Sequence, residues 1–389
     1  MHTSRRKLFL GLIGIILLVF VIAGAVLYPK AKAQLTTPLG PGLELPTRTL
    51  SLNTPTSTDI PATLISQARS TDTLEIDIST DLPPTSTSVP TPTPEPLCGG
   101  PPTMLILGVG ADSGDEYLYG LADVIRIVRV DFVTPKVTVL SMPRDLWVEL
   151  PSGIQSPSGN VVSNSKLNQA YFYGGPGMGY YDGPGAGPGL LARTLEGNFG
   201  LLVDHYGAVN MYTFSRIVDA VGGIDLYLPT DVDGRPVDSK TEDMGYFYAG
   251  QRHFNGDQAL RFARIRKKYN DFTRMDHQNM VLCALKEKIT SPAVLPKIPQ
   301  IIASFKDSAL TDLSLEQLGQ LACLAPHLKR ENLIFTSLPE EILGSGTVYS
   351  PIQKNTTYVV EADFEVIRNY VDQFVAGTWP NEPDEPSCP

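Results

Sequence analysis

Thr103-Met104-Leu105-Ile106-Leu107-Gly108-Val109 is a continuous apolar run in a chain of 389 residues. A short run of this kind predicts a strand that is buried on both faces. Val124–Val130 and Lys136–Leu140 predict two more strands, joined by a turn at Thr134-Pro135. The folded region is therefore expected to open with three strands.

Helical patterns follow these strands, and a late strand is expected at Thr357–Val360. The expected helices are Gly189–Phe199, Tyr212–Val221, Gly256–Phe262, Thr273–Ile289, Leu315–Ala325 and Phe364–Val375. Strands interleaved with amphipathic helices predict an α/β layered domain with a mixed sheet.

The protein is acidic, with a formal net charge of -10, and 42% of its residues are hydrophobic. This charge argues against nucleic acid as a general partner, because a phosphate backbone needs a broad basic surface. A compact anionic ligand needs only one basic pocket. The length and the apolar content fit one large domain with appendages.

The N-terminal segment predicts the compartment. Residues 1–7 are a basic cytoplasmic tail, and residues 8–28 are an uncharged apolar run, long enough to span a hydrocarbon core of about 30 Å. The basic flank predicts a single-pass anchor in the cell membrane, with the N-terminus in the cytoplasm and the rest of the chain outside. A signal peptide cleaved near Ala31-Lys32-Ala33 is the alternative.

The remaining chain divides by composition. Residues 29–97 are rich in Pro, Thr and Ser and predict a disordered extracytoplasmic stalk. Residues 98–380 form the expected catalytic domain, and residues 381–389 form a C-terminal tail.

Four cysteines fit an extracytoplasmic domain, where disulfides persist. Cys98 and Cys388 bracket the folded region, whereas Cys283 and Cys323 lie in apolar helical patterns. Pairing Cys98 with Cys388 and Cys283 with Cys323 is the simplest of the three possible connectivities. Buried free thiols are the alternative for Cys283 and Cys323. No spacing among the four suggests a zinc site.

A basic cluster inside this acidic chain indicates a function. Arg264 and Arg266 are two residues apart, so in an extended segment both guanidinium groups leave one face and can bind a multivalent anion. Asp271 is expected to cap a helix that carries Arg274 in its first turn and Gln278 one turn further on. A cation there opposes the helix dipole unless an anion binds at that end. A solvated charged face is the alternative interpretation.

Acidic residues stand at the ends of the early strands. Asp112 follows the first strand and Asp123 precedes the second, so neighbouring strands would bring both carboxylates to one sheet edge. Oxygen ligands with open water positions suit Mg²⁺ or Mn²⁺. Taken separately, the two aspartates would be turn or cap residues. The third strand ends in Ser141-Met142-Pro143-Arg144-Asp145, whose arginine alone would be an exposed or ion-paired residue.

Seven short motifs follow one another through the folded region. They are Asp112 after the first strand, Ala122-Asp123 before the second, Ser141–Asp145, Lys166-Leu167-Asn168-Gln169-Ala170-Tyr171 with Tyr173-Gly174-Gly175, Val218–Asp225, Asn255–Leu260, and Arg264-Ile265-Arg266 followed by Asp271–Arg274 and Gln278. In this order they resemble the LytR-CpsA-Psr family, from Pro102 to about Phe374. No single motif is specific, and the resemblance depends on their order.

The resemblance implies a three-layer α-β-α sandwich and a glycopolymer transferase. Such an enzyme moves an anionic or phosphate-linked glycopolymer from a polyprenyl-diphosphate carrier to the cell wall, usually peptidoglycan, with Mg²⁺. By this likeness, Asp112 and Asp123 would hold the metal. The residues that would bind the diphosphate are Arg144, Arg264, Arg266, Arg274 and Gln278, and those that would carry catalysis are Asp123, Arg144, Arg264 and Arg266.

Elementary chemistry supports the same assignment. A departing polyprenyl phosphate needs a preorganised cationic clamp, and water must be excluded. The acceptor hydroxyl needs a base, for which Asp123 and Asp145 are the candidates. A polyprenyl-diphosphate hydrolase and a catalytically weak lipid- or glycan-binding regulatory module are the alternatives.

The sequence also departs from the family pattern. Leu121 stands where an arginine is usual two residues before the second metal-site aspartate, and Gly114 stands where another arginine is frequent. His277 occupies a third position where arginine is common. Arg126 and Arg129 are the available substitutes, and otherwise the donor differs or activity is reduced.

Two further features have two interpretations each. The loop Tyr171–Gly189 is rich in Gly, Pro and Tyr and is either a mobile flap that stacks on sugars or a surface loop. Apolar helix faces would shelter an isoprenoid in the family, but core packing explains the same residues. His205, His253 and His327 have no spacing that suggests a shared site.

Overall fold

The computed structural model describes residues 32–46, 95–114, 117–239, 241–266, 268–269, 271–298, 300–301, 305, 308–350, 354–381 and 388. The expected membrane anchor at 8–28 and most of the expected stalk at 29–97 lie outside these residues. Among the residues described, no helix is long and apolar enough to cross a bilayer.

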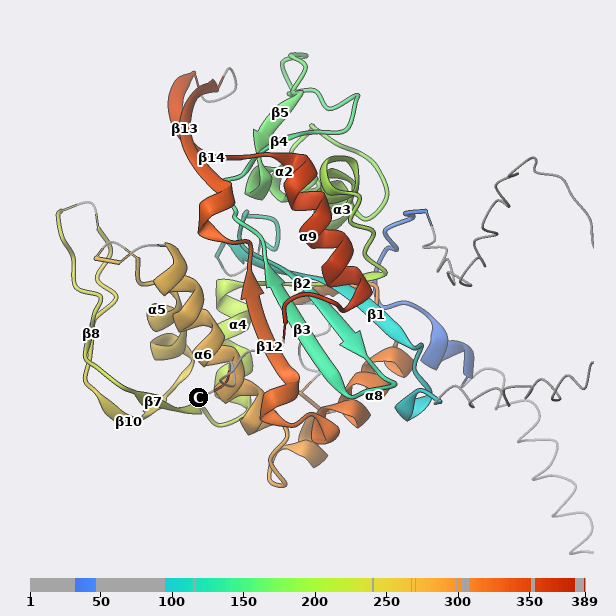
Figure 1. Cartoon of the computed structure of the whole chain (residues 1–389), viewed down its shortest axis with the longest axis vertical. Coiled ribbons are helices and arrows are strands. Elements are labelled where there is room, and N and C mark those ends of the chain that lie inside the picture. The colour runs from blue at the N-terminus through green and yellow to red at the C-terminus, as the bar shows by residue number, and fades with distance from the viewer. Residues whose placement is uncertain are drawn as a thin grey trace, which may run out of the picture. The chain divides into compact units, whose positions relative to one another are not determined.

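A six-stranded mixed sheet forms the centre of the domain (Figure 1). Its strands, in spatial order, are β11 (Ala309–Thr311), β6 (His205–Asn210), β1 (Thr103–Asp112), β2 (Leu121–Asp131), β3 (Lys136–Ser141) and β12 (Leu333–Ser337). β6 and β12 run parallel to β1 and β3, and the other pairs are antiparallel. The three strands expected at the start of the domain are confirmed as neighbours.

Helices cover both faces of this sheet. The main apolar core joins one face to α2 (Leu167–Tyr173), α3 (Ala186–Phe199) and α9 (Phe364–Ala376). The opposite face lies against α4 (Met211–Ala220), α5 (Gly256–Arg264), α6 (Asp271–Ile289) and α8 (Leu315–Leu324). The expected layered α/β domain with a mixed sheet is confirmed.

In the described part of the chain, four two-stranded ribbons accompany the central sheet. They pair β4 (Trp147–Glu149) with β5 (Asn164–Lys166), β7 (Ile224–Leu228) with β10 (Gly250–Phe254), β8 (Val232–Asp233) with β9 (Tyr246–Phe247), and β13 (Leu343–Ser350) with β14 (Asn355–Ala362). The strand expected at Thr357–Val360 is part of β14, outside the central sheet. Val360 N donates to Asp145 O at 2.9 Å, which joins this ribbon to the end of β3.

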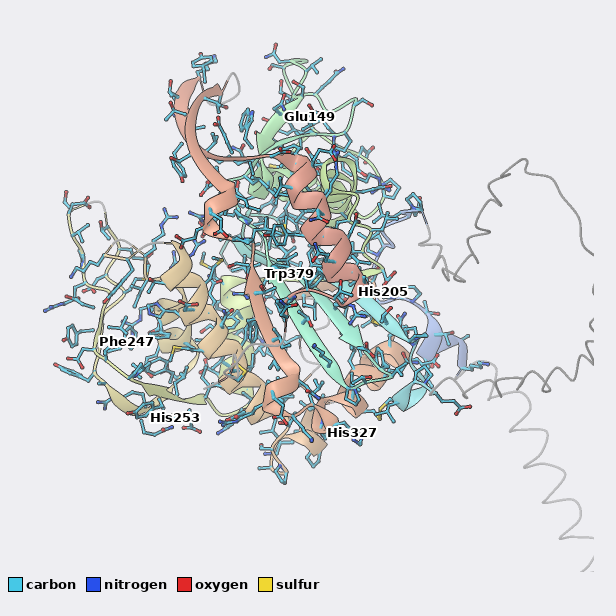
Figure 2. The ribbon with its side chains drawn as sticks, in the orientation of Figure 1. Glu149, His205, Phe247, His253, His327 and Trp379 are labelled. Atoms are coloured by element: carbon cyan, nitrogen blue, oxygen red, sulfur yellow. A yellow bond between two sulfur atoms is a disulfide. The ribbon has the colours of Figure 1, made fainter. Side chains whose placement is uncertain are left out.

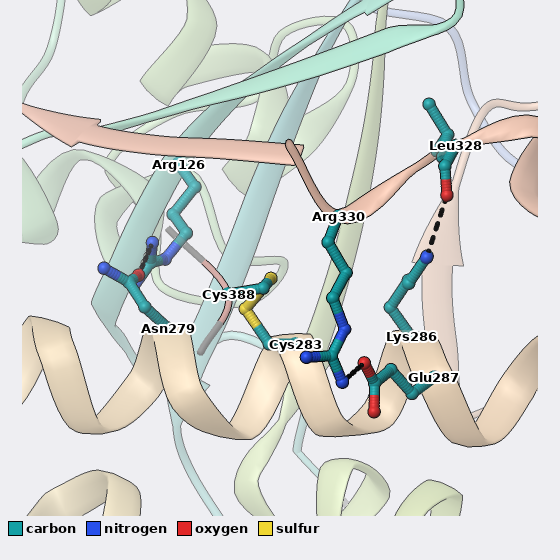
Figure 3. The surroundings of a disulfide bond; sticks show 8 residues. All are labelled: Arg126, Asn279, Cys283, Lys286, Glu287, Leu328, Arg330 and Cys388. Atoms are coloured by element: carbon teal, nitrogen blue, oxygen red, sulfur yellow. Dashed lines mark hydrogen bonds and ion pairs between the residues drawn. A yellow bond between two sulfur atoms is a disulfide. The ribbon is translucent and has the colours of Figure 1, made fainter. Parts of the chain in front are cut away.

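The disulfides correct the expected pairing. Cys98 bonds Cys323, and Cys283 bonds Cys388, so neither the expected pairing nor free thiols occur. The physical reason is spatial: Cys98 packs in the small core beneath α8, which carries Cys323. Cys283 lies on α6 against the β3–β12 edge, where the end of the chain returns (Figure 3). Helical periodicity shows which cysteines are buried but not which helices meet.

A described part of the expected stalk packs on the domain. Leu43 is 4% exposed and belongs to the main core. Its carbonyl accepts from Arg193 Nη2 at 2.8 Å, and Pro41 O accepts from Tyr206 Oη at 3.1 Å. The expectation of disorder was therefore wrong for this stretch, because partners on the domain supply the burial and hydrogen bonds that the segment lacks alone.

The Gly- and Tyr-rich loop is held by its own aromatic rings. Tyr171 is fully buried in α2 and donates to Leu118 O at 2.9 Å. Tyr173 stacks on Tyr180 with ring centroids 4.5 Å apart. These contacts favour a packed surface loop over a mobile flap.

Candidate active site

A large pocket lies between the second face of the sheet and helices α4, α5 and α6. Its volume is about 890 Å³. Side chains alternate along each strand of the sheet. One set of alternate residues therefore faces the main core, and the other set faces the helices and lines the pocket. Gly108, Gly110 and Gly207 form part of its floor, and a Cβ added at Gly207 would meet nothing within 4 Å. The missing side chains leave the space open.

The inner part of the pocket is apolar. The sheet contributes Val128, Val137, Val139, Leu333 and Phe335, and the helices contribute Leu260, Val281 and Leu282. This wall suits a hydrocarbon ligand. Of the helix faces that the sequence left between core packing and ligand shelter, one group of α5 and α6 residues lines the pocket and another fills a separate core.

The mouth of the pocket is charged. β1 and β2 are antiparallel, and Asp112 pairs with Leu121 in their register. The end of β1 and the start of β2 therefore meet at one edge and bring Asp112 and Asp123 together, as the sequence predicted. Both carboxylates line the pocket.

The two carboxylates disfavour each other's charge. Burial, and next the charge of Asp123, raise the pKa of Asp112 above its usual value, against the opposing effect of Arg264 and Arg144. A divalent cation between them would relieve this repulsion. Within the described residues no three His, Cys, Asp or Glu side chains gather into a metal-binding group, and His205, His253 and His327 lie far apart (Figure 2). Mg²⁺ often takes only one or two carboxylates, with water and phosphate oxygens as its other ligands, so this donor set fits it.

Opposite charges alternate along one side of the mouth. Arg144 Nη1 forms an ion pair with Asp123 Oδ1, and Arg144 Nε lies 3.4 Å from Asp145 Oδ2. Lys166 Nζ donates to Asp145 Oδ1 at 2.9 Å. The Arg144 side chain is only 11% exposed, so these pairs are weakly screened by water. The network fixes Arg144 at the strand end.

Arg264 and Arg266 both line the pocket, as predicted, but on a different backbone. Arg264 is the last residue of α5, and Ile265 is an extended cap with 2% exposure that packs in a core cluster and also lines the pocket. The two arginines therefore come from a helix end and the turn after it, not from a strand. Arg264 Nη2 lies 3.1 Å from Glu242 Oε2, an exposed partner that an anionic ligand would replace.

Helix α6 supplies Arg274 and Gln278 to the pocket. The helix begins at Asp271, so its first turn lies where the sequence placed it. The side chain of Asp271, and with it the expected cap, lies outside the described structure. Arg274 is 6% exposed, which rules out the solvated-face interpretation for this arginine.

The structure separates the two substitute arginines. Arg126 lines the pocket, whereas Arg129 points to the other face, where its Nε donates to Val375 O at 3.1 Å. His277 packs against the Phe262 ring at 4.4 Å and does not line the pocket. Burial lowers the pKa of His277 to about 4, so its ring is neutral and does not replace an arginine.

Sequence reasoning gave no role to several pocket residues. Lys166 stood within a quoted motif, and Glu242, Arg235 and Lys268 carried no local signal. Asn210 caps α4, and its Nδ2 donates to Gly114 O at 2.8 Å, which holds the loop that follows Asp112. Contacts of this kind depend on tertiary structure.

Comparisons with known proteins agree with this architecture. Residues 63–370 match the model of the LytR_cpsA_psr family. Polyisoprenyl-teichoic acid–peptidoglycan teichoic acid transferase TagV of Bacillus subtilis is 28% identical over 219 residues, which are 56% of this chain and 51% of TagV. The corresponding transferase TagU of Oceanobacillus iheyensis is 31% identical over 268 residues, which are 68% of this chain and 72% of TagU.

The solved structure of B. subtilis TagV has the same fold. Its TM-score to this chain is 0.51 at 25% identity, over 70% of this chain and 97% of the TagV chain. The sequence match to TagV spans only about half of that relative's own length.

Proposed function

The chain belongs to the LytR_cpsA_psr family, and we propose that it transfers a phosphate-linked glycopolymer from a polyprenyl-diphosphate carrier to a cell-wall glycan. Peptidoglycan is the proposed acceptor, because the relatives TagV and TagU carry teichoic acid and peptidoglycan in their names. The substrates and the reaction are proposals for this chain.

One observation carries the proposal: an apolar pocket of about 890 Å³ opens into a mouth lined by both carboxylates and arginines. A polyprenyl diphosphate has the same division, with a hydrocarbon chain at one end and concentrated negative charge at the other. The hydrocarbon chain of the donor would fill the inner pocket. Its diphosphate would lie among four arginines, Arg144, Arg264, Arg266 and Arg274. Such burial also excludes water, which favours transfer over hydrolysis.

Asp112 and Asp123 would hold Mg²⁺. Bound there, the ion would neutralise phosphate charge. The residues of the chain do the remaining work: the arginines orient the diphosphate and stabilise the charge that develops as its central bond breaks. Asp123 and Asp145 both contact Arg144 and are the proposed candidates to take the proton of the acceptor hydroxyl.

The proposed location is extracytoplasmic, with residues 8–28 as a single-pass anchor in the cell membrane. Two disulfides support this location, because such bonds persist outside the reducing cytoplasm. The proposed substrates, a lipid-linked donor and a wall glycan, meet at the outer face of the membrane.

The test incubates the full-length chain in detergent with Mg²⁺, a polyprenyl-diphosphate-linked glycan and peptidoglycan fragments. Mass spectrometry follows the glycan phosphate. Asp123→Ala and Arg264→Ala are the test variants. Asp257→Ala and Arg252→Ala are matched controls, since both residues lie outside the pocket lining.

Covalent glycan phosphate on the acceptor, lost in both test variants and kept in both controls, would support transfer. Release of free glycan phosphate without acceptor product would instead indicate a hydrolase. A donor that binds and is recovered intact would indicate a regulatory binding module. Either of the last two results rejects the proposed transfer.

A further inference from the structure

Arg126 is a buried cation that lines the pocket. We propose that it binds the lipid-side phosphate of the donor and stabilises that phosphate as the leaving group. This inference rests on the proposed function. It concerns a residue in the middle of β2, away from the strand-end motifs that mark the site.

The contacts of Arg126 hold it in place without neutralising it. Nη1 donates to Asn279 Oδ1 at 2.7 Å and Nη2 donates to Gln278 Oε1 at 3.1 Å, and Figure 3 shows the first of these bonds. The guanidinium carbon lies 5.8 Å from the centre of the Phe335 ring. Both hydrogen-bond acceptors are neutral amides. Among the described residues, the hydrogen-bond partners of Arg126 are these two amides, and its Nε has none.

A second cation, Arg274, increases the electrostatic free-energy cost of keeping Arg126 charged inside the protein. Arg126 is 4% exposed and Arg274 is 6% exposed. Burial, and next the charge of Arg274, lower the pKa of Arg126 to about 10, so Arg126 stays charged at neutral pH. A buried cation held only by neutral amides is stabilised by an anion that contacts it. The pocket that Arg126 lines gives such an anion access.

The order of residues along β2 identifies which phosphate this is. Asp123 stands at the mouth, Arg126 follows three residues further in, and Val128 belongs to the apolar inner wall. Along the strand, Arg126 therefore lies between Asp123 and Val128. A donor that lies along β2 would place its glycan-side phosphate near the carboxylates and its lipid-side phosphate near Arg126. Its hydrocarbon chain would then lie beyond Arg126, against the apolar wall.

The reaction then balances as follows. The acceptor oxygen bonds to the glycan-side phosphorus, and the bond from that phosphorus to the bridging oxygen breaks. The bridging oxygen leaves on the lipid-side phosphate with the electron pair, and the hydroxyl proton passes to a carboxylate at the mouth. Arg126 would face the oxygen on which this charge develops.

Gln278 acts through Arg126. Its Oε1 accepts from Arg126, while its Nε2 lies 3.4 Å from Ala263 O on α5. The amide thereby orients the guanidinium from one side and ties α6 to α5 from the other. Gln278→Glu would place a carboxylate at 3.1 Å from Arg126 and supply an internal anion.

The test measures the affinity of the full-length chain for three probes by calorimetry: farnesyl diphosphate, farnesyl monophosphate and N-acetylglucosamine 1-phosphate. Arg126→Met should weaken farnesyl monophosphate binding about 10- to 100-fold, since a hydrogen bond to a charged group is lost. Binding of the sugar phosphate should be unchanged. The affinity of Arg126→Lys for farnesyl monophosphate should lie between those of the wild type and Arg126→Met. Gln278→Glu should weaken the binding of farnesyl monophosphate and raise the melting temperature.

Arg129→Met is the control on the same strand and the opposite face, and it should lower stability without changing any affinity. If Arg126→Met does not fold, Arg126→Lys and Gln278→Glu decide the matter alone. Unchanged farnesyl monophosphate affinity, or equal losses for both monophosphates, would overturn the inference. Failure of the wild type to bind farnesyl diphosphate at all would reject the proposed function itself.

Discussion

Filling the floor of the pocket tests whether the apolar space holds a lipid chain. Gly207 lies on β6 with an ordinary strand backbone, and an added Cβ would meet nothing within 4 Å. Gly207→Leu therefore adds four carbons to the pocket, and the first of them, Cβ, meets no neighbouring atom. At about 0.8 kcal/mol for each buried carbon that the ligand loses, donor binding should weaken by about 3 kcal/mol, or roughly 100-fold.

The same substitution should stabilise the ligand-free protein. Glycine in a strand is about 0.5–1 kcal/mol less favourable than alanine, and the new side chain would also be buried. Calorimetric titration with farnesyl diphosphate and denaturant unfolding measure the two effects, which have opposite signs. Gly344→Leu on β13 is the control, since its Cβ would make only an ordinary contact outside the pocket. Donor affinity equal to that of the wild type in Gly207→Leu would refute the assignment of the pocket.

Three other predictions concern charge and cross-links. The raised pKa of Asp112 means that its charge destabilises the metal-free fold at neutral pH, so Asp112→Asn should raise the melting temperature there, and the gain should vanish as pH falls through the folded pKa; no gain at pH 7 would contradict this. The pKa of His277 is lowered to about 4 in the folded protein, so as pH falls the unfolded chain binds a proton on this side chain before the folded protein does. The free energy of unfolding should therefore fall by about 3 kcal/mol between pH 6.5 and 4. His277→Phe should flatten this part of the pH profile in denaturant unfolding, and an unchanged slope would show that His277 does not cause it. Replacing Cys283 and Cys388 with serine should lower the unfolding free energy by about 2–5 kcal/mol, and a non-reducing digest should yield their cross-linked peptide; a peptide linking Cys98 to Cys388 would contradict the structure.

Residues that act from strand ends could be predicted from the sequence. Asp112, Asp123 and Arg144 each follow or precede an apolar run, and antiparallel neighbours must bring such positions to one edge. Arg264 and Arg266 were placed on one side by their spacing alone. The local backbone differed, because Arg264 ends a helix, yet both arginines line the pocket.

Residues that act from the middle of a strand could not be predicted. Arg126 and Arg129 differ in parity and so face opposite sides of the sheet. Each face of β2 carries apolar residues and an arginine, so the sequence does not show which face α4–α6 leave open. The disulfide pairing and the packing of Leu43 failed for the same reason, since both depend on which distant segments meet.

The cross-link between Cys283 and Cys388 constrains the helix that carries Arg274 and Gln278. Cys283 follows Gln278 by little more than one turn, so the bond ties this part of α6 to Cys388, which packs against Val139 and Leu333 of the sheet. A binding site that is rigid before its ligand arrives loses less entropy on association. The ordering of these side chains is thus completed during oxidative folding, before the first donor binds.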